Sequence, residues 1–150
     1  MPKNKNLKYY EAVGRRKSAT ARVRLYIFNK QNKIKVNDTE LKKGDIIVNG
    51  KDITEIYKHK WEEEKYLKPL RLTDCVDRFG ISILVKGGGK EGQLDAIVHG
   101  IAKALNEVNR DQYRPVLKAE GLLTRDSRVR ERRKVGTGGK ARRKKQSPKR

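Results

Sequence analysis

Apolar and polar residues alternate along two segments of the chain, and each alternation predicts a β-strand. In residues 21–27, small or branched apolar side chains alternate with Arg22, Arg24 and Tyr26. A period of two places the apolar side chains on one face of a strand and the two arginines on the other. Residues 79–85 alternate in the same way and lead directly into a run of three glycines. The pattern predicts a sheet with one buried face and one basic face.

Shorter signals place further elements between these two strands. Residues 29–33 have turn chemistry, and Ile34 and Val36 are expected to begin a partner strand. Residues 46–48 form a short apolar run that ends at Asn49-Gly50, a strong turn signal. Residues 53–65 are expected to be helical.

The clearest helix is predicted to start near Gln93 and to reach about Val108. Its apolar residues recur at steps of three and four and form one stripe, made of Leu94, Ile97, Val98, Ile101, Ala102, Leu105 and Val108. Gly100 costs this helix about 1 kcal/mol relative to alanine, and a close approach of the backbone to the sheet would explain it. A second helix is predicted over residues 111–120, with Pro115 in or near its first turn and Gly121 ending it.

The net charge of the chain indicates the class of molecule that it binds. Its 150 residues suffice for one domain, and 39 Lys and Arg against 18 Asp and Glu give a net charge of +21. Such a charge is typical of nucleic-acid-binding proteins, although histones, antimicrobial proteins and membrane-surface proteins share it. No stretch of 18 apolar residues and no secretory signal is apparent. Cys75 is the single cysteine and is expected to be a small buried residue in a cytosol-like compartment.

The positive charge is concentrated in the C-terminal segment. Residues 125–150 contain 13 Lys and Arg and 2 Asp and Glu, a net charge of +11, and no aromatic residue. Such a segment cannot bury enough apolar surface to fold alone, and fully extended it would reach about 85 Å. We therefore expect a flexible N-terminus over residues 1–8, a globular RNA-binding domain over residues 9–124, and an extended basic tail over residues 125–150.

The glycine-rich segment Gly87 to Gly92 has two interpretations. Its three spaced glycines, between a strand and a helix, match a dinucleotide-binding loop. That fold needs several βαβ units, however, and this chain is too short for them. Because glycines allow main-chain N–H groups to approach phosphate and a helix N-terminus favours anions, an RNA phosphate suits the same loop.

Patterns of catalytic or metal-binding residues are absent from the sequence. His59 and His99 have no zinc-ligand spacing with Cys75, so we expect His59 to lie exposed beside Trp61 and His99 to be a hydrogen-bonded structural residue. Glu62 to Glu64 are expected to form a solvated helix face. We therefore expect binding rather than catalysis, with no cofactor, no metal and no small-molecule substrate.

A compact basic motif lies just before the first alternating strand. Arg15, Arg16 and Lys17 follow Gly14, and Arg22 and Arg24 continue the basic surface on the strand. The planar guanidinium fits phosphate with two parallel hydrogen bonds, which suits structured RNA. The motif is therefore expected to contact phosphates.

Four ordered segments resemble the ninth small-subunit ribosomal protein, a universal family, in its bacterial or organellar form. They are Gly14 to Val23 (GRRKSATARV), Val85 to Leu105 (VKGGG, GQ and AIVHGIAKAL), Leu123 to Gly136 (LTRDSR and ERRKVG), and Lys140 to Arg143 (KARR) with the terminal Lys149-Arg150. Together they span about residues 9–150. Each is modest alone, but the ordered set is specific.

The resemblance implies a fold, a place and partners. The fold is α+β, with a mostly antiparallel sheet packed with helices, a left-handed βαβ crossover and an extended basic C-terminal tail. The place is the head of the small ribosomal subunit, bound to the 3′ domain of its ribosomal RNA beside neighbouring head proteins. The tail is implied to thread through that RNA and to approach the peptidyl-site transfer RNA with its end. The ribosome is expected to be cytoplasmic, with an organellar one also open.

Residue by residue, these arguments give a set of expected contacts. Those expected for ribosomal RNA are Arg15, Arg16, Lys17, Arg22, Arg24, Lys86, Gly87, Gly88, Gly89, Lys90, Arg125, Arg128, Arg130, Arg132, Arg133, Lys134, Lys140, Arg142, Arg143, Lys144 and Lys145. Those expected for transfer RNA are Lys149 and Arg150.

The sequence departs from the family pattern at a few positions. Ser147 and Pro148 stand where an aromatic residue and a serine usually precede the final pair, and Thr137 to Gly139 is one residue longer than usual. Asn37 to Val48 is interpreted as an inserted hairpin. Val98 stands where a basic residue often precedes the His-Gly pair, so we expect this position not to bind RNA.

Two other functions remain open at this point. The protein subunit of the tRNA-processing ribonucleoprotein ribonuclease is also small and basic, but its Arg-Asn-Arg motif is absent, with Asn109-Arg110 the nearest approach. A histone-like DNA-compacting protein would share the basic tail but not the glycine-rich loop.

Overall fold

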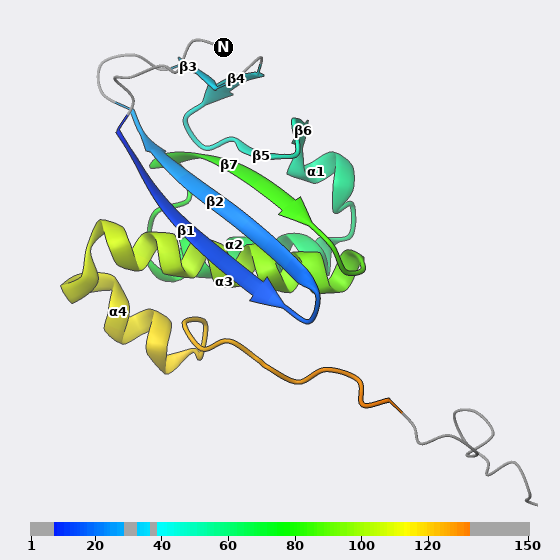
Figure 1. Ribbon diagram of the computed structural model, residues 1–150. Coiled ribbons are helices and arrows are strands. Elements are labelled where there is room, and N and C mark those ends of the chain that lie inside the picture. Colours follow the sequence, from blue (N-terminus) through cyan, green and yellow to red (C-terminus); the bar gives the residue numbers. More distant parts are fainter. Residues whose placement is uncertain (1–7, 29–32, 37–38, 133–150) are drawn as a thin grey trace, which may run out of the picture.

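Five strands form the central sheet in the computed structural model, which describes residues 8–28, 33–36 and 39–132 (Figure 1). In sheet order these are β1 (Tyr9–Arg16), β2 (Ala19–Ile27), β7 (Phe79–Lys86), β5 (Ile46–Val48) and β6 (Lys51–Asp52). The helices are α1 (Ile53–Ile56), α2 (Lys60–Leu72), α3 (Lys90–Val108) and α4 (Arg110–Ala119), and a separate two-stranded sheet holds β3 (Lys33–Val36) and β4 (Thr39–Lys42).

The two predicted alternating strands lie side by side in the centre of the sheet. β2 pairs antiparallel with both β1 and β7, and Val23 lies opposite Ile83. Val23 and Leu25 are fully buried, whereas Arg22 on the other face is exposed. The period-two pattern thus identified both strands and the face that each turns to the main core, as predicted. Tyr26, which was expected on the outer face with the two arginines, is buried instead in a second apolar cluster with Ile34 and Leu41.

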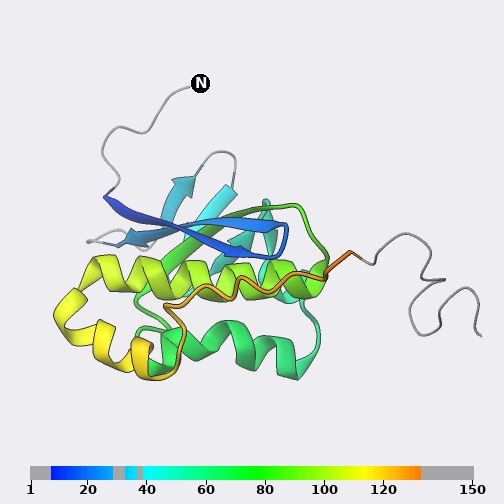
Figure 2. The same ribbon diagram turned by 60° about the horizontal axis from the view of Figure 1, so that its bottom comes forward.

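The connection from β5 to β7 is a left-handed crossover, as the family resemblance implied. β5 and β7 are parallel neighbours in the sheet, with Ile47 opposite Ser82. Between them the chain returns through α2, which lies with α3 on one face of the sheet (Figures 1 and 2). With the helices behind the sheet in Figure 1, β5 and β7 both run to the right and the chain steps downward, which gives the left-handed turn. The other strand pairs are antiparallel.

The strand that begins near Ile34 does not pair with β2, contrary to the prediction. β3 pairs with β4, with Ile34 opposite Leu41, and β2 finds its partners in β1 and β7. Gly80 leaves room for Leu41 and Phe28 to pack on the sheet, since a Cβ there would lie 2.7 Å from each. The hairpin predicted over residues 37–48 is instead formed by β3 and β4, while residues 46–48 belong to the main sheet. Residues 29–32 of the predicted turn lie outside the described residues.

The helix predicted over residues 53–65 is broken into two. Asp52 begins α1 by accepting a hydrogen bond from the Thr54 main chain, at 2.8 Å from Oδ1 to N. α2 begins after His59, whose main-chain N–H donates to Glu62 Oε2 at 3.2 Å. Two separate N-terminal capping arrangements thus occur within the window that was expected to form one helix.

The long helix α3 starts three residues earlier than predicted and lies closely against β1 and β2. A Cβ on Gly100 would lie 2.6 Å from Val23 Cγ2 and 3.3 Å from the main-chain N of Gly14. This close approach is the reason expected for a glycine in the middle of the helix. α4 begins after Asn109, which caps it, and Gly121 follows its end with φ of +68°, as predicted for a left-handed residue there.

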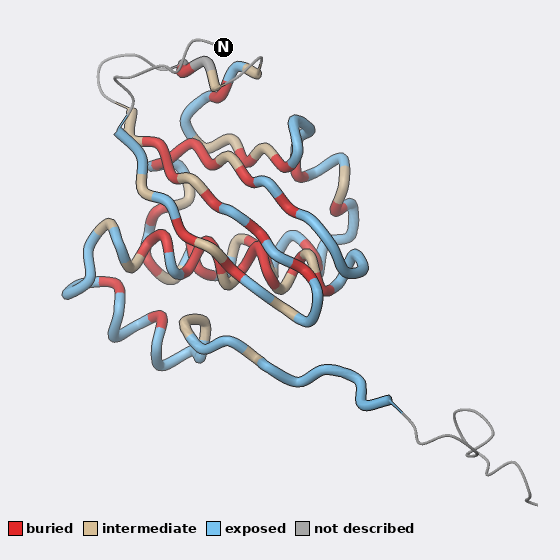
Figure 3. Tube along the Cα trace, viewed as in Figure 1, coloured by how far each residue is buried: buried red, intermediate tan, exposed pale blue. Residues whose placement is uncertain are grey.

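The core lies between the sheet and the helices (Figure 3). Ile97, Ile101 and Leu105 of the predicted stripe are fully buried, and Cys75 is buried as expected. The Cys75 thiol lies 3.4 Å from the hydroxyl of Tyr113. In the part of the chain that the structure describes, no helix is long and apolar enough to cross a lipid bilayer.

Candidate RNA-binding surface

The β1–β2 turn and the glycine-rich loop form one end of the domain. Lys17, in the turn, has φ of +50°, and Gly87 and Gly88 also have positive φ. A Cβ on Gly87 would lie 2.5 Å from the carbonyl oxygen of Ser18, and one on Gly88 would lie 2.9 Å from Ala19 Cβ. The glycines therefore let the loop pack against the basic turn, which is a structural reason beside the phosphate approach inferred from the sequence.

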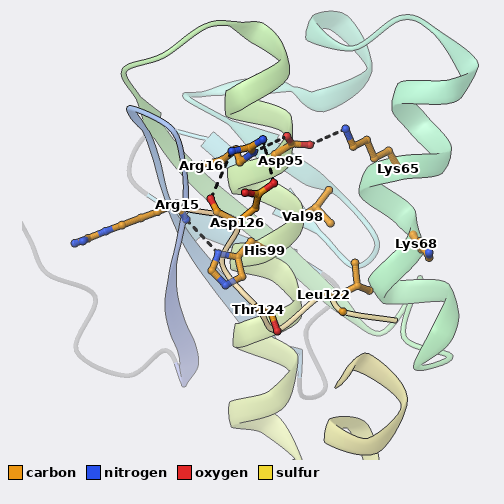
Figure 4. Close-up of a pocket in the computed structure, with 11 residues that line it drawn as sticks. Arg15, Arg16, Lys65, Lys68, Asp95, Val98, His99, Leu122, Thr124 and Asp126 are labelled. Atoms are coloured by element: carbon orange, nitrogen blue, oxygen red, sulfur yellow. Dashed lines mark hydrogen bonds and ion pairs between the residues drawn. The ribbon is translucent and has the colours of Figure 1, made fainter. Parts of the chain in front are cut away.

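Three cations of this end point to solvent. Arg15, Lys17 and Lys86 are exposed, and Figure 4 shows the Arg15 side chain directed away from the other side chains drawn there. Within the described part of the chain, none of these three side chains has an ion-pair partner. They are free to meet an anion from outside. We call Arg15, Lys17 and Lys86 the cationic end.

Lys90, which the sequence grouped with the glycine loop, is turned toward α2 instead. Its Nζ lies 2.8 Å from Glu62 Oε1 and 5.5 Å from the centre of the Tyr57 ring. The hydrogen bond from Lys90 lowers the pKa of Glu62. Glu62 is only 3% exposed, so it does not belong to a solvated face as predicted, whereas Glu63 and Glu64 do.

Arg22 and Arg24 lie on the open face of the sheet and share one carboxylate. Arg24 Nε lies 2.6 Å from Glu11 Oε2, and Arg22 Nε lies 3.8 Å from Glu11 Oε1. Arg24 also lies over the ring of Tyr9, 5.1 Å from its centre. Glu11 offsets one of the two charges, and Arg22 keeps about half of its side chain exposed. This basic face is continuous with the cationic end through β2.

The start of the tail returns along α3 toward the cationic end (Figure 2). Arg125, Arg128, Arg130 and Arg132 are exposed along it. Arg128 donates to both carboxylate oxygens of Asp126, at 3.0 Å from Nε to Oδ1 and 2.8 Å from Nη2 to Oδ2. These bonds hold the pKa of Asp126 well below its usual value. The further predicted contacts lie outside the described residues: Arg133, Lys134, Lys140, Arg142, Arg143, Lys144, Lys145, Lys149 and Arg150.

Arg16 differs from the other predicted phosphate contacts because its guanidinium is already surrounded by protein acceptors. It borders a cleft of about 390 Å³ between α2, α3 and the tail, together with Asp95, Val98, His99 and Asp126 (Figure 4). Arg16 Nη2 lies 3.2 Å from Asp126 Oδ2, and Nε lies 3.4 Å from Asp95 Oδ2. Its side chain is only 16% exposed.

His99 is a hydrogen-bonded structural residue, as predicted, and it joins β1 to the tail. Its Nδ1 accepts from the main-chain N–H of Arg15 at 3.3 Å, and the ring also hydrogen-bonds to the main chain of Leu123. Lys103 donates to the carbonyl oxygen of Val13 at 3.2 Å, so two side chains of α3 satisfy the outer edge of β1. The sequence pattern gave no signal for these edge contacts, because residues 84 and 90 positions apart meet only in the fold.

His99 should make the stability of the fold depend on pH. Burial lowers the pKa of His99, and the positive charges of Lys103 and Arg125 act in the same direction. Since Nδ1 accepts a hydrogen bond, protonation removes that bond. The stability that the neutral His99 ring adds to the fold is therefore complete above about pH 6.5, the pKa of histidine in the unfolded chain. This stability is lost as the pH falls below that value. Between pH 7 and 5, the free energy of unfolding measured by chemical denaturation should fall less for His99→Gln than for the wild type. The control, His59→Gln at an exposed position, should lose as much as the wild type. Equal losses in all three proteins would contradict the assignment.

The chain matches one known protein family over most of its length, and this match separates the functions that the sequence left open. Residues 14–150 match the family described as ribosomal protein S9/S16. The chain belongs to this family. Small ribosomal subunit protein uS9 of Thermus thermophilus is 44% identical over 130 residues, covering 87% of this chain and 90% of that protein. Protein uS9 of Rickettsia rickettsii is 42% identical over 151 residues, covering 99% and 85%, and that of Tropheryma whipplei is 40% identical over 124 residues, covering 83% and 71%.

Membership of the ribosomal protein S9/S16 family confirms the resemblance drawn from the four segments. The match runs through all four, including the tail, and not merely through the glycine-rich loop. It favours neither the ribonuclease subunit nor a DNA-compacting protein. The dinucleotide interpretation of Gly87 to Gly92 also loses its basis, because the described strands contain one parallel pair, β5 with β7, and do not form a doubly wound sheet.

Proposed function

We propose that the protein is a structural constituent of the small ribosomal subunit that binds the 3′ domain of its ribosomal RNA in the head. Family membership supports the ribosomal role, and the bacterial relatives support a ribosome in the cytoplasm. One observation of the structure carries the RNA-binding part. The β1–β2 turn, the end of β7 and the first residues of the tail, which are distant in sequence, bring exposed cations toward one end of the domain.

Recognition by this surface rests on phosphates and shape. Folded RNA presents its backbone more readily than its base edges, and exposed arginines and lysines bind that backbone. Arg15, Lys17 and Lys86 form the rigid part of the surface, and Arg22 extends it across the open face of the sheet. The tail adds reach, and its net charge of +11 over residues 125–150 suits a path along many RNA phosphates.

The end of the tail has a second proposed partner. Lys149 and Arg150 match the terminal pair that approaches the anticodon stem-loop of the peptidyl-site transfer RNA in the family. The domain would then fix the origin of the tail on ribosomal RNA, and the last two residues would contact transfer RNA. Membership of the ribosomal family supports a structural role rather than an enzymatic one.

The cationic end can be tested by the salt dependence of RNA binding. Replacing Lys17 and Lys86 with alanine should reduce the slope of log affinity against log salt by about 1.4 to 1.8, at about 0.7–0.9 for each phosphate that is no longer neutralised. The affinity of the purified protein for a transcript of the 3′ domain is measured at several salt concentrations.

A matched control removes the same charge elsewhere. Lys43, in the β4–β5 loop, and Lys118, in α4, are exposed and lie away from the cationic end. Their double alanine variant should keep the wild-type slope. If both double variants changed the slope equally, binding would depend on net charge alone, and the proposed surface would be wrong.

A further inference from the structure

Two neighbouring arginines of the basic motif have different surroundings. Arg15 extends into solvent, whereas Arg16 is enclosed between β1, α3 and the tail (Figure 4). Arg16 Nη1 donates to the carbonyl oxygen of Arg128 at 2.7 Å and lies 3.5 Å from that of Asp126. Together with the carboxylates of Asp95 and Asp126, these carbonyls occupy all three nitrogens of the guanidinium.

We propose that Arg16 is a positioning residue, which holds the start of the tail against α3 and aims it past the cationic end, and that it does not itself bind phosphate. A guanidinium suits this task because its donors lie in one rigid plane and can serve several acceptors at once. Asp126 and Arg128 are the parts of the tail that it grips. A phosphate could reach Arg16 only by displacing acceptors that the protein already supplies.

The contacts of Arg16 with the tail belong to a network of ion pairs that joins four segments of the protein. Lys65 of α2 lies 2.6 Å from Asp95 of α3, and Asp95 lies 3.4 Å from Arg16 of β1. Arg16 then meets Asp126, which is fixed in turn by the side chain and the main-chain N–H of Arg128. Because carboxylates and cations alternate along this network, each charge has an opposite neighbour. The network therefore fixes the tail to the same elements that build the domain core.

Fixing the tail has a consequence for binding, and this part of the inference rests on the proposed function. A tail that leaves the domain in one direction loses less conformational freedom when it is ordered on RNA. Arg16 would then affect affinity without contributing a phosphate contact. Arg15, at the adjacent position, would contribute a contact without fixing the tail.

The first test measures the tail in the free protein. Hydrogen exchange of main-chain amides over residues 124–130 is compared among the wild type, Arg16→Ala and Arg15→Ala. Exchange at Arg128 should become faster by about tenfold or more in Arg16→Ala and stay unchanged in Arg15→Ala. Amides of β7 and the middle of α3 should keep their protection in both variants. Unchanged exchange over residues 124–130 in Arg16→Ala, with the core intact, would overturn the proposal.

A second variant keeps the test decisive if Arg16→Ala is poorly folded. Asp126→Asn removes the charge with which Arg16 pairs, at a partly exposed position outside the core, and should loosen the same amides. The loss of protection in the double variant should be smaller than the sum of the two single losses, because the Arg16–Asp126 ion pair is removed by both substitutions. Additive effects would show that Arg16 and Asp126 act separately, contrary to the proposal.

The third measurement separates a positioning role from a phosphate contact. For the 3′-domain transcript, Arg16→Ala should weaken binding by about tenfold, the scale of ordering one or two more residues, with an unchanged salt slope. Arg15→Ala should reduce the slope by about 1. A slope reduced by about 1 in Arg16→Ala would overturn the inference while leaving the proposed function standing. If the wild type did not bind the transcript, the proposed function would fail, and the exchange measurement would still decide the role of Arg16.

Discussion

Gly14→Ala should destabilise the domain by at least about 3 kcal/mol, the upper part of the range for overpacked positions. A Cβ on Gly14 would collide with the carbonyl oxygen of Ala96 and the main chain of Gly100, and it would lie 2.8 Å from Gly100 Cα. These are backbone atoms of α3, so no side-chain rotation can relieve the collision. The helix would have to move away from β1 and open the core along its whole length.

Thermal and chemical unfolding measure this effect, and a second glycine provides the control. Gly89 has open space around its Cα and a φ of −95°, so an alanine there should change the free energy of unfolding by less than about 1 kcal/mol. Gly14→Ala should lower the midpoint temperature by about 10 °C or more. A Gly14→Ala protein as stable as Gly89→Ala would mean that α3 does not lie against β1 in this way.

The sequence pattern predicted the strands and helices that have one buried face, and it predicted pairing less well. β2, β7 and α3 were identified because their apolar residues follow the period of their secondary structure over seven or more positions. The partner of β3 was wrong because Ile34 and Val36 fit any neighbouring strand equally well. Their burial against Leu41 and Phe28 depends on Gly80, a residue more than forty positions away.

In the candidate site too, the sequence predicted which residues are basic but not which contacts they make in the fold. Charge and motif predicted that Arg15, Lys17 and Lys86 contact RNA, and the structure places these residues on the surface at one end of the domain. The same reasoning could not separate Arg16 or Lys90 from them. The partners of Arg16 lie 79 to 112 positions away, and Lys90, at the start of α3, meets Glu62 in the first turn of α2. Which cations remain free is decided by tertiary contacts, which a local pattern does not contain.

Removing the end of the tail should have the largest effect on RNA binding. Deleting residues 142–150 removes six cations, namely Arg142, Arg143, Lys144, Lys145, Lys149 and Arg150. If each neutralises one phosphate, the slope of log affinity against log salt should become shallower by about 4 to 5, at about 0.7–0.9 per phosphate. An unchanged slope would mean that this part of the tail does not contact RNA.

A shorter truncation separates the two proposed partners of the tail. A chain that ends at Pro148 lacks only Lys149 and Arg150, so it should keep most of the salt slope for ribosomal RNA and enter small subunits nearly normally. Peptidyl-site transfer RNA should bind these subunits more weakly than wild-type subunits, because the two charges that are removed are the ones proposed to contact the anticodon stem-loop. The comparison uses reconstituted subunits and filter binding of transfer RNA. Normal transfer RNA binding by the shorter chain would restrict the tail to ribosomal RNA, and the charge over residues 142–145 would then account for its effect.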